Sequence, residues 1–228
     1  MPPTLTRAKP KTPPALPLLE GLALTHARAH EACGPSRLVF AALTARATQG
    51  PILWIRPAYG HAHLNPDGLA PWCDPSRLLI VDAPRAPDLL WAAEEGLRIG
   101  HVPLIVVEMP QPPALTPVRR LHLAAETGRE VTGQGPICLL LTPGQGGAQG
   151  IESRWHIAPV PGWATAEGHP NWALKRTRAR LAPEAAWRLS FDGLTPHLHP
   201  ASEKQADAPG PSPQPSTQTK ASATSVQP

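Results

Sequence analysis

Cysteine is scarce in this sequence, and long apolar runs are missing from it. The three cysteines, Cys33, Cys73 and Cys138, are an odd number at unrelated spacings, and two of them lie beside apolar runs typical of buried strands. This pattern argues against a disulfide framework and favours a reduced, cytoplasmic protein. No window approaches the uninterrupted apolar length of a membrane span, so we expect neither a signal peptide nor a transmembrane helix.

Proline and glycine, by contrast, are abundant. The chain of 228 residues has 32 prolines and 18 glycines, which lie mostly at the ends and in connections. Residues 1–17 and 199–228 carry too little apolar surface to offset the entropy that ordering them would cost. We therefore predict two disordered tails around one folded domain, residues 18–198, whose length suits a single core.

Short apolar runs alternate with amphipathic segments in the predicted domain. A short strand ending at Cys33 comes first, and the later apolar runs are typical of buried strands: residues 52–55, 78–81, 104–107 and 137–141. Helical spacing predicts one helix capped by Ser36, one beginning at Pro87, and one beginning at Thr116 and ending at Gly128. This order indicates an α/β fold with a mostly parallel sheet and helices on both faces.

The pattern changes after the glycine-rich segment 144–150. Residues 153–159, 171–181 and 187–191 alternate as strands do, with no helix between them. Asp192-Gly193 is a pair typical of hairpin turns. We therefore expect an antiparallel C-terminal extension along one edge of the sheet.

The turn after the first strand is where phosphate chemistry should show in a nucleotide-binding α/β domain, because backbone amides and a helix N-terminus meet there. Here the turn reads Gly34-Pro35-Ser36-Arg37. A P-loop needs more residues and a Lys-Ser or Lys-Thr pair, since the lysine neutralises terminal phosphates and the hydroxyl holds magnesium. Ser36 and Arg37 could still meet an anion, and an ordinary capped helix start is the alternative.

Several segments resemble known proteins. Residues 30–35, followed by a helix, resemble the start of the RecA core with its phosphate loop shortened, and residues 50–55 resemble its second strand. Residues 88–98 resemble the helix before the Walker B strand, and residues 119–126 the helix after it. These two helices, together with residues 154–159, are closer to the bacterial ImuA family, RecA-like accessory proteins of SOS mutagenesis that are also called SulA-like.

The resemblance, which spans roughly residues 21–189, implies a RecA-like P-loop-type core with a degenerate site. The Walker B strand of RecA ends in an aspartate that assists magnesium, whereas the matching strand here ends in Glu108. Where RecA places the glutamate that activates water, this chain has Arg56-Pro57. Because phosphoryl transfer depends on positioning and charge stabilisation, the loss of lysine, hydroxyl and base together predicts a protein that is not an enzyme and has no cofactor, with binding of ATP as the disfavoured alternative. The degenerate nucleotide site would comprise Gly34, Pro35, Ser36, Arg37 and Glu108, the last of these being, alternatively, a solvated carboxylate at a strand end.

One connection carries residue types that can ligate metal. His61, His63 and Cys73 lie in it, but no second ligand pair at zinc spacing accompanies them. We therefore predict no metal site.

Basic residues recur after the parallel strands, and the formal net charge of +4 permits contact with nucleic acid or an acidic partner. Alternation along a strand would place Arg176, Arg178 and Arg180 on one face, where they could meet DNA phosphates. The alternative is a solvated edge strand whose charges discourage aggregation. The candidate DNA- or partner-binding residues are Lys175, Arg176, Arg178, Arg180, Arg119 and Arg120.

Three functional hypotheses follow. The first, implied by the resemblance, is a non-catalytic accessory protein of the bacterial SOS response that acts in translesion synthesis through contacts with RecA or a translesion polymerase complex. The second is an ATP-binding RecA-like switch or DNA-dependent ATPase. The third, suggested by the SulA-like label, is an inhibitor of cell division. The sequence indicates neither which partner binds nor the oligomeric state.

Overall fold

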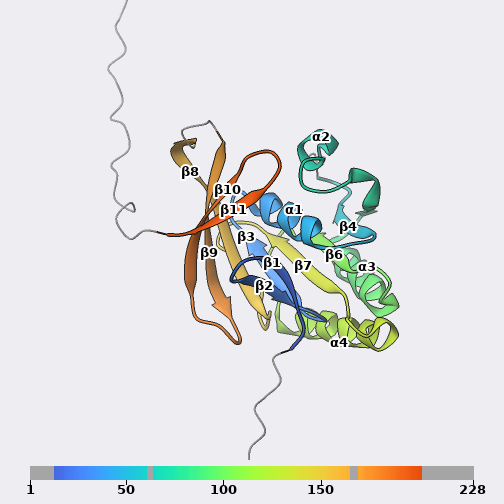
Figure 1. The fold of residues 1–228 in the computed structure, drawn as a ribbon. Helices are drawn as coiled ribbons and strands as arrows, with labels where there is room; N and C mark the ends of the chain where they lie inside the picture. Colours follow the sequence, from blue (N-terminus) through green and yellow to red (C-terminus); the bar gives the residue numbers. More distant parts are fainter. Residues whose placement is uncertain (1–12, 61–63, 165–168, 202–228) are drawn as a thin grey trace, which may run out of the picture.

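The computed structural model describes residues 13–60, 64–164 and 169–201, which form a mixed α/β structure around a nine-stranded sheet (Figure 1). The strands of this sheet are β3 (Ala29–Cys33), β4 (Ile52–Pro57), β5 (Leu78–Ala83), β6 (Leu104–Glu108), β7 (Ile137–Thr142), β8 (Ser153–Ala164), β9 (Pro170–Ala179), β10 (Ala185–Phe191) and β11 (Pro196–Pro200). Their spatial order is β11-β10-β9-β8-β3-β7-β6-β4-β5. Within the described ranges, no helix combines the length and the apolar character that crossing a bilayer demands.

The strands from β8 to β5 are parallel, and β9, β10 and β11 continue the sheet in antiparallel fashion. The predicted, mostly parallel sheet and its antiparallel extension are thus confirmed. From β3 the chain moves toward one edge of the sheet, and it later returns to β8 on the other side of β3. The carboxyl ends of β3 and β8 therefore lie at a topological switch point, the place where α/β sheets bind ligands.

Both faces of the sheet are covered (Figure 1). The helix α1 (Arg37–Ala47) packs on one face together with the hairpin of β1 (Ala15–Leu19) and β2 (Leu22–Thr25), and α3 (Ala86–Ile99) and α4 (Leu115–Thr132) pack side by side on the other. Each face has its own apolar core. The connection between β4 and β5 contains two short helices, α2 (Pro66–Leu69) and the 3-10 helix η1 (Pro75–Arg77).

The helices α3 and α4 approach closely because two glycines meet between them. A Cβ atom on Gly128 would lie 2.1 Å from the backbone oxygen of Leu97, and one on Gly100 would lie 2.4 Å from the backbone oxygen of Gly128. Gly128 is therefore an interior contact residue of α4, and the prediction that it ends this helix is wrong. The helix ends at Gly133, whose φ of 81° suits a glycine C-cap.

One predicted buried strand lies at the edge of the sheet. Residues 78–81 belong to β5, where the side chains of Leu79 and Ile80 are 51% and 48% exposed. A continuous apolar run predicts a strand, but the position of that strand in the sheet depends on its contacts with distant segments. The covering of both faces is thus incomplete at this edge.

The strands reach a few residues beyond the predicted domain of residues 18–198. The hairpin of β1 and β2 begins at Ala15, and β11 continues to Pro200. Sequence reasoning missed this hairpin because a proline and a glutamate interrupt its apolar residues. In the structure Leu16, Leu18 and Leu24 alternate into the core on the α1 face, which is the ordinary pattern of a half-buried strand.

Candidate functional site

The turn between β3 and α1 is closed by contacts with β8. The backbone N–H of Ser36 donates to the oxygen of Ile157 at 3.1 Å, and the N–H of Arg37 donates to the oxygen of Gly34 at 3.3 Å. Pro35 has no N–H to offer. Gly34 adopts a φ of +91°, and a Cβ atom there would lie 2.4 Å from the oxygen of Ile157. The amides of Ser36 and Arg37 are therefore bonded within the chain rather than directed at an anion.

The side chains of this turn add little to an anion site. Ser36 stands at the N-cap position of α1, but its hydroxyl makes no capping hydrogen bond, so the predicted side-chain cap is wrong. The Nη1 of Arg37 donates to the oxygen of Gly34 at 3.3 Å. Both residues lie in the predicted turn, where Arg37 bonds to Gly34 and the amide of Ser36 bonds to Ile157 of β8.

Glu108 is the last residue of β6 and lies at the same carboxyl end of the sheet as the turn between β3 and α1. Its side chain is hydrogen-bonded within the protein. Its Oε1 accepts a hydrogen bond from the Nε1 of Trp54 at 2.7 Å. Glu108, Arg37 and Arg56 line a common cavity of about 160 Å³. Arg56 donates to Asp82 at 2.6 Å, and this hydrogen bond raises the pKa of the Arg56 guanidinium. Cavities that hold cofactors measure roughly 300–1,000 Å³, so this cavity is too small for a nucleotide.

A buried carboxylate was missed by sequence reasoning. Glu31 in β3 has no exposed surface, and it accepts hydrogen bonds from Thr142 Oγ1 at 2.6 Å, from the backbone of Gly147 at 2.9 Å and of Ala148 at 3.1 Å, and from Arg154 Nε at 2.5 Å. These bonds hold the glycine-rich segment before β8 against the sheet. The available signal was an acidic residue inside a strand that is otherwise buried.

The arginines of β9 do not share one face, because a bulge interrupts the strand. The register with β8 shifts between the pairs that contain Arg176 and Arg178, which leaves Thr177 as the extra residue. Arg176 lies on the α1 face, with its guanidinium carbon 5.5 Å from the ring centre of Trp155 and 5.2 Å from that of Trp187. The prediction of a common face is therefore wrong for Arg176. The strand is also not an edge strand, since β10 and β11 lie outside it.

Arg178 and Arg180 instead meet Arg119 around a cavity of about 340 Å³ between α4 and the end of β9. His122 of α4 also lines it. Burial, with a further contribution from Arg28, lowers the pKa of His122 to about 4, so its ring is neutral at pH 7. We call this cavity the basic groove.

Two of the candidate basic residues, Arg120 and Lys175, do not line the basic groove. Arg120 donates to Glu94 at 2.8 Å and so joins α4 to α3. Lys175 is exposed on β9 opposite His156, which places it on the same face of the sheet as Arg178. Of the six candidates, the structure brings Arg119, Arg178 and Arg180 together.

A third cavity, of about 780 Å³, lies between the beginnings of α3 and α4 and the connection that follows β6. Its lining includes Leu90, Trp91 and Met109 together with several prolines, and the side chain of Trp91 is 63% exposed. Exposed apolar surface of this kind marks interaction sites. We call it the apolar groove.

The candidate metal ligands are not assembled in the part of the chain that the structure describes. His61 and His63 lie outside the described residues, and Cys73 is buried. Among the described residues, no group of three His, Cys, Asp or Glu side chains could hold a metal ion. Burial raises the pKa of Cys33 to about 11 and that of Cys138 to about 12, so these thiols stay protonated.

Comparison with known proteins assigns no family. No protein-family profile matches the chain, and no curated protein matches it. Among solved structures, SulA from Pseudomonas aeruginosa is similar at 18% identity, with 50% of this chain and 98% of the SulA chain covered and a TM-score of 0.39. A likeness at this level carries no inference about fold or function. The resemblance of sequence segments to RecA and ImuA therefore stays a prediction.

Proposed function

We propose that this chain is a non-catalytic accessory protein, built on a RecA-like scaffold, that acts through protein–protein contacts in the bacterial SOS response. The observation that supports the non-catalytic part is the closed turn between β3 and α1, where the amide of Ser36 is bonded to Ile157. A phosphate site needs such amides free and directed at the ligand. The RecA-like scaffold and the setting in DNA damage rest on the sequence resemblance.

The surroundings of the turn support the same proposal. The Lys-Ser or Lys-Thr pair of a P-loop is missing from the turn. Glu108, which stands where RecA has its magnesium-assisting aspartate, accepts from Trp54, and the cavity beside it is smaller than a nucleotide. Hydrolysis would require all of these features at once, because positioning and charge stabilisation supply the catalysis.

The apolar groove is the surface that we assign to the protein partner. It presents Leu90 and Trp91 from α3 beside Met109, and large exposed aromatic side chains of this kind supply much of the binding energy at protein interfaces. The partner is RecA or a subunit of a translesion polymerase complex. The segment that docks presents apolar side chains to Trp91.

Binding of the purified full-length chain to RecA, and separately to a translesion polymerase subunit, tests this proposal. We expect association with one of the two at micromolar concentration or below, and at least a tenfold loss of affinity on Trp91→Ala. The matched control is Leu181→Ala, which removes another strongly exposed apolar side chain outside the apolar groove. Absence of association with both partners, or equal effects of the two substitutions, would contradict the proposal.

A further inference from the structure

The basic groove holds arginines that no carboxylate neutralises. Six of the other described arginines form ion pairs with Asp or Glu, namely Arg28, Arg56, Arg85, Arg98, Arg120 and Arg154. Among the described residues, Arg119, Arg178 and Arg180 have no such pair. The acidic residue that lines the groove, Glu152, lies 3.7 Å from the Nε of Arg28 and is nearly buried. The groove therefore carries unneutralised positive charge.

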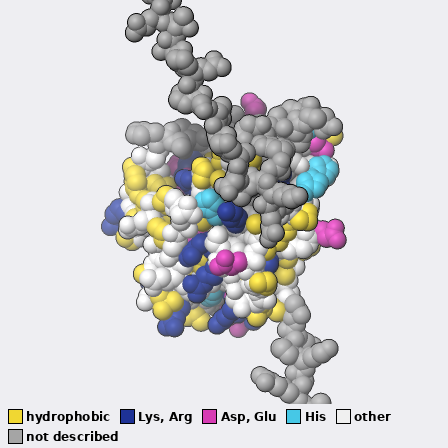
Figure 2. Space-filling view, turned by 90° about the vertical axis from the view of Figure 1, so that its left-hand side faces the viewer, with side chains coloured by type: hydrophobic (Ala, Val, Ile, Leu, Met, Phe, Trp, Pro, Cys, Tyr) yellow, Lys and Arg dark blue, Asp and Glu magenta, His cyan; other side chains and the backbone are white. Residues whose placement is uncertain are grey.

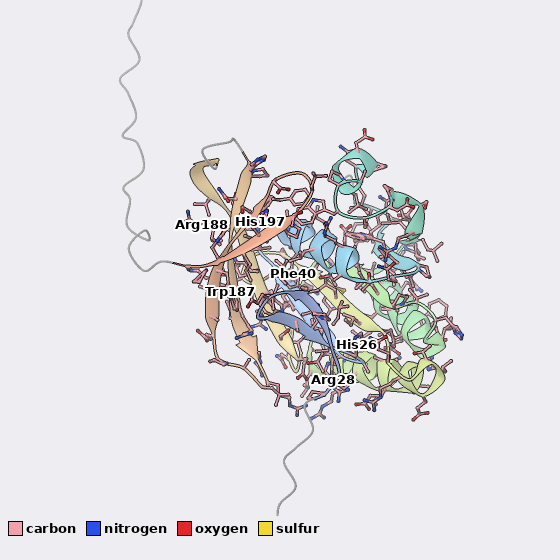
Figure 3. All side chains as sticks on the ribbon, viewed as in Figure 1. His26, Arg28, Phe40, Trp187, Arg188 and His197 are labelled. Carbon is pink, nitrogen blue, oxygen red and sulfur yellow. The ribbon has the colours of Figure 1, made fainter. Side chains whose placement is uncertain are left out.

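His122 adds a second, independent feature. Its Nε2 is buried and has no hydrogen-bond partner among the described residues, although the ring lines the basic groove. A buried polar atom without a partner is costly in a folded protein, so such an atom points to a ligand or a water molecule. Figure 3 places Arg28 beside α4, at the end of the sheet where β3 begins. The charges of Arg28 and Arg180 both act on the ring, and Glu126, the ion-pair partner of Arg28, opposes them.

The chemistry of the walls restricts the ligand. Arginine guanidinium groups bind phosphate through paired N–H donors. Arg119 comes from α4 and Arg178 and Arg180 from the end of β9, so charges lie on two walls of an open groove. Its apolar lining, Leu115 and Ile151, offers no aromatic ring on which a base could stack. Contacts of this kind fit a phosphate backbone and carry no sequence information.

We infer that the basic groove binds the sugar–phosphate backbone of a nucleic-acid strand without sequence preference. Figure 2 looks onto the side of the molecule formed by β8 to β11 and shows Lys and Arg side chains across the middle and lower part of that face, with few acidic ones. This basic surface extends the electrostatic attraction beyond the groove itself. The inference does not depend on the proposed protein partner, which occupies a different cavity.

Fluorescence anisotropy with a labelled single-stranded oligonucleotide tests the inference. We expect binding by the full chain at low salt, with the logarithm of the association constant falling by about 2 per tenfold rise in salt if each arginine meets one phosphate. The triple substitution Arg119→Ala, Arg178→Ala, Arg180→Ala should weaken binding at least tenfold and remove most of this slope. Two oligonucleotides of unrelated sequence should bind alike.

The matched control removes the same charge elsewhere. Arg85→Ala, Arg98→Ala, Arg129→Ala also lowers the formal net charge from +4 to +1 but leaves the groove intact, so its binding should stay within about twofold of the unsubstituted chain. In the unsubstituted chain, the ring resonances of His122 should shift as oligonucleotide is added. No binding, equal losses in both triple variants, an unchanged His122 signal, or binding of inorganic phosphate alone would each overturn the inference.

Discussion

At the scale of single residues, Glu31 connects more of the structure than any residue of the predicted nucleotide site. Its carboxylate lies within β3 and collects donors from β7, from the glycine-rich segment and from β8. The partner Arg154 also donates to the backbone oxygen of Ala148 at 2.9 Å. One buried ion pair thus positions the segment that leads into β8, the strand that closes the turn at Ser36.

Replacing Glu31 with Gln should strongly destabilise the fold. The substitution leaves the Arg154 charge largely buried without its partner, and breaking a buried pair in this way costs about 3–5 kcal/mol. Urea unfolding of the variant measures the loss. The control is Glu95→Gln, which breaks the partly exposed pair with Arg98 and should change stability little. Equal and small effects of both substitutions would show that the Glu31 network does not stabilise the fold.

Residue roles were only partly predictable from the sequence. The positions of Gly34, Ser36 and Glu108 followed from the strand pattern and the resemblance. Their contacts did not, because Ile157 and Trp54 come from strands that are distant in the chain. Glu31 was missed for the same reason, since its donors come from segments more than a hundred residues away.

At the scale of elements, the apolar runs of β4, β6 and β7 predicted strands because these strands are buried on both faces. The edge position of β5 and the bulge at Thr177 were not predictable, since both depend on how strands pair. The bulge matters for the proposed site. It turns Arg178 toward the α4 face, where it meets Arg119, and leaves Arg176 against the rings of Trp155 and Trp187.

The connection between β3 and α1 yields a prediction at this scale. Gly34→Ala should destabilise the chain by clearly more than Gly21→Ala, because both glycines have positive φ but only at Gly34 would the new Cβ meet a backbone oxygen. Strain alone accounts for about 1–3 kcal/mol at either position. The difference between the two variants in urea unfolding measures the contact with β8. Identical losses would mean that β8 does not close the turn.

At the scale of the whole molecule, two grooves lie outside the turn between β3 and α1. The apolar groove lies between α3 and α4, and the basic groove lies between α4 and β9. The carboxyl ends of β3 and β6, where α/β proteins ordinarily bind ligands, are occupied by bonds within the chain. Under the proposed function, these internal bonds suit a protein that works by contacting partners.

Titration of the purified full-length chain with ATP and magnesium in a calorimeter tests whether the turn before α1 can bind a nucleotide. We expect no saturable heat at nucleotide concentrations up to the millimolar range, because the turn before α1 lacks a lysine and its Ser36 and Arg37 amides are bonded within the chain. A saturable signal that disappears on Glu108→Ala would contradict it, since that result would place a nucleotide at the end of β6.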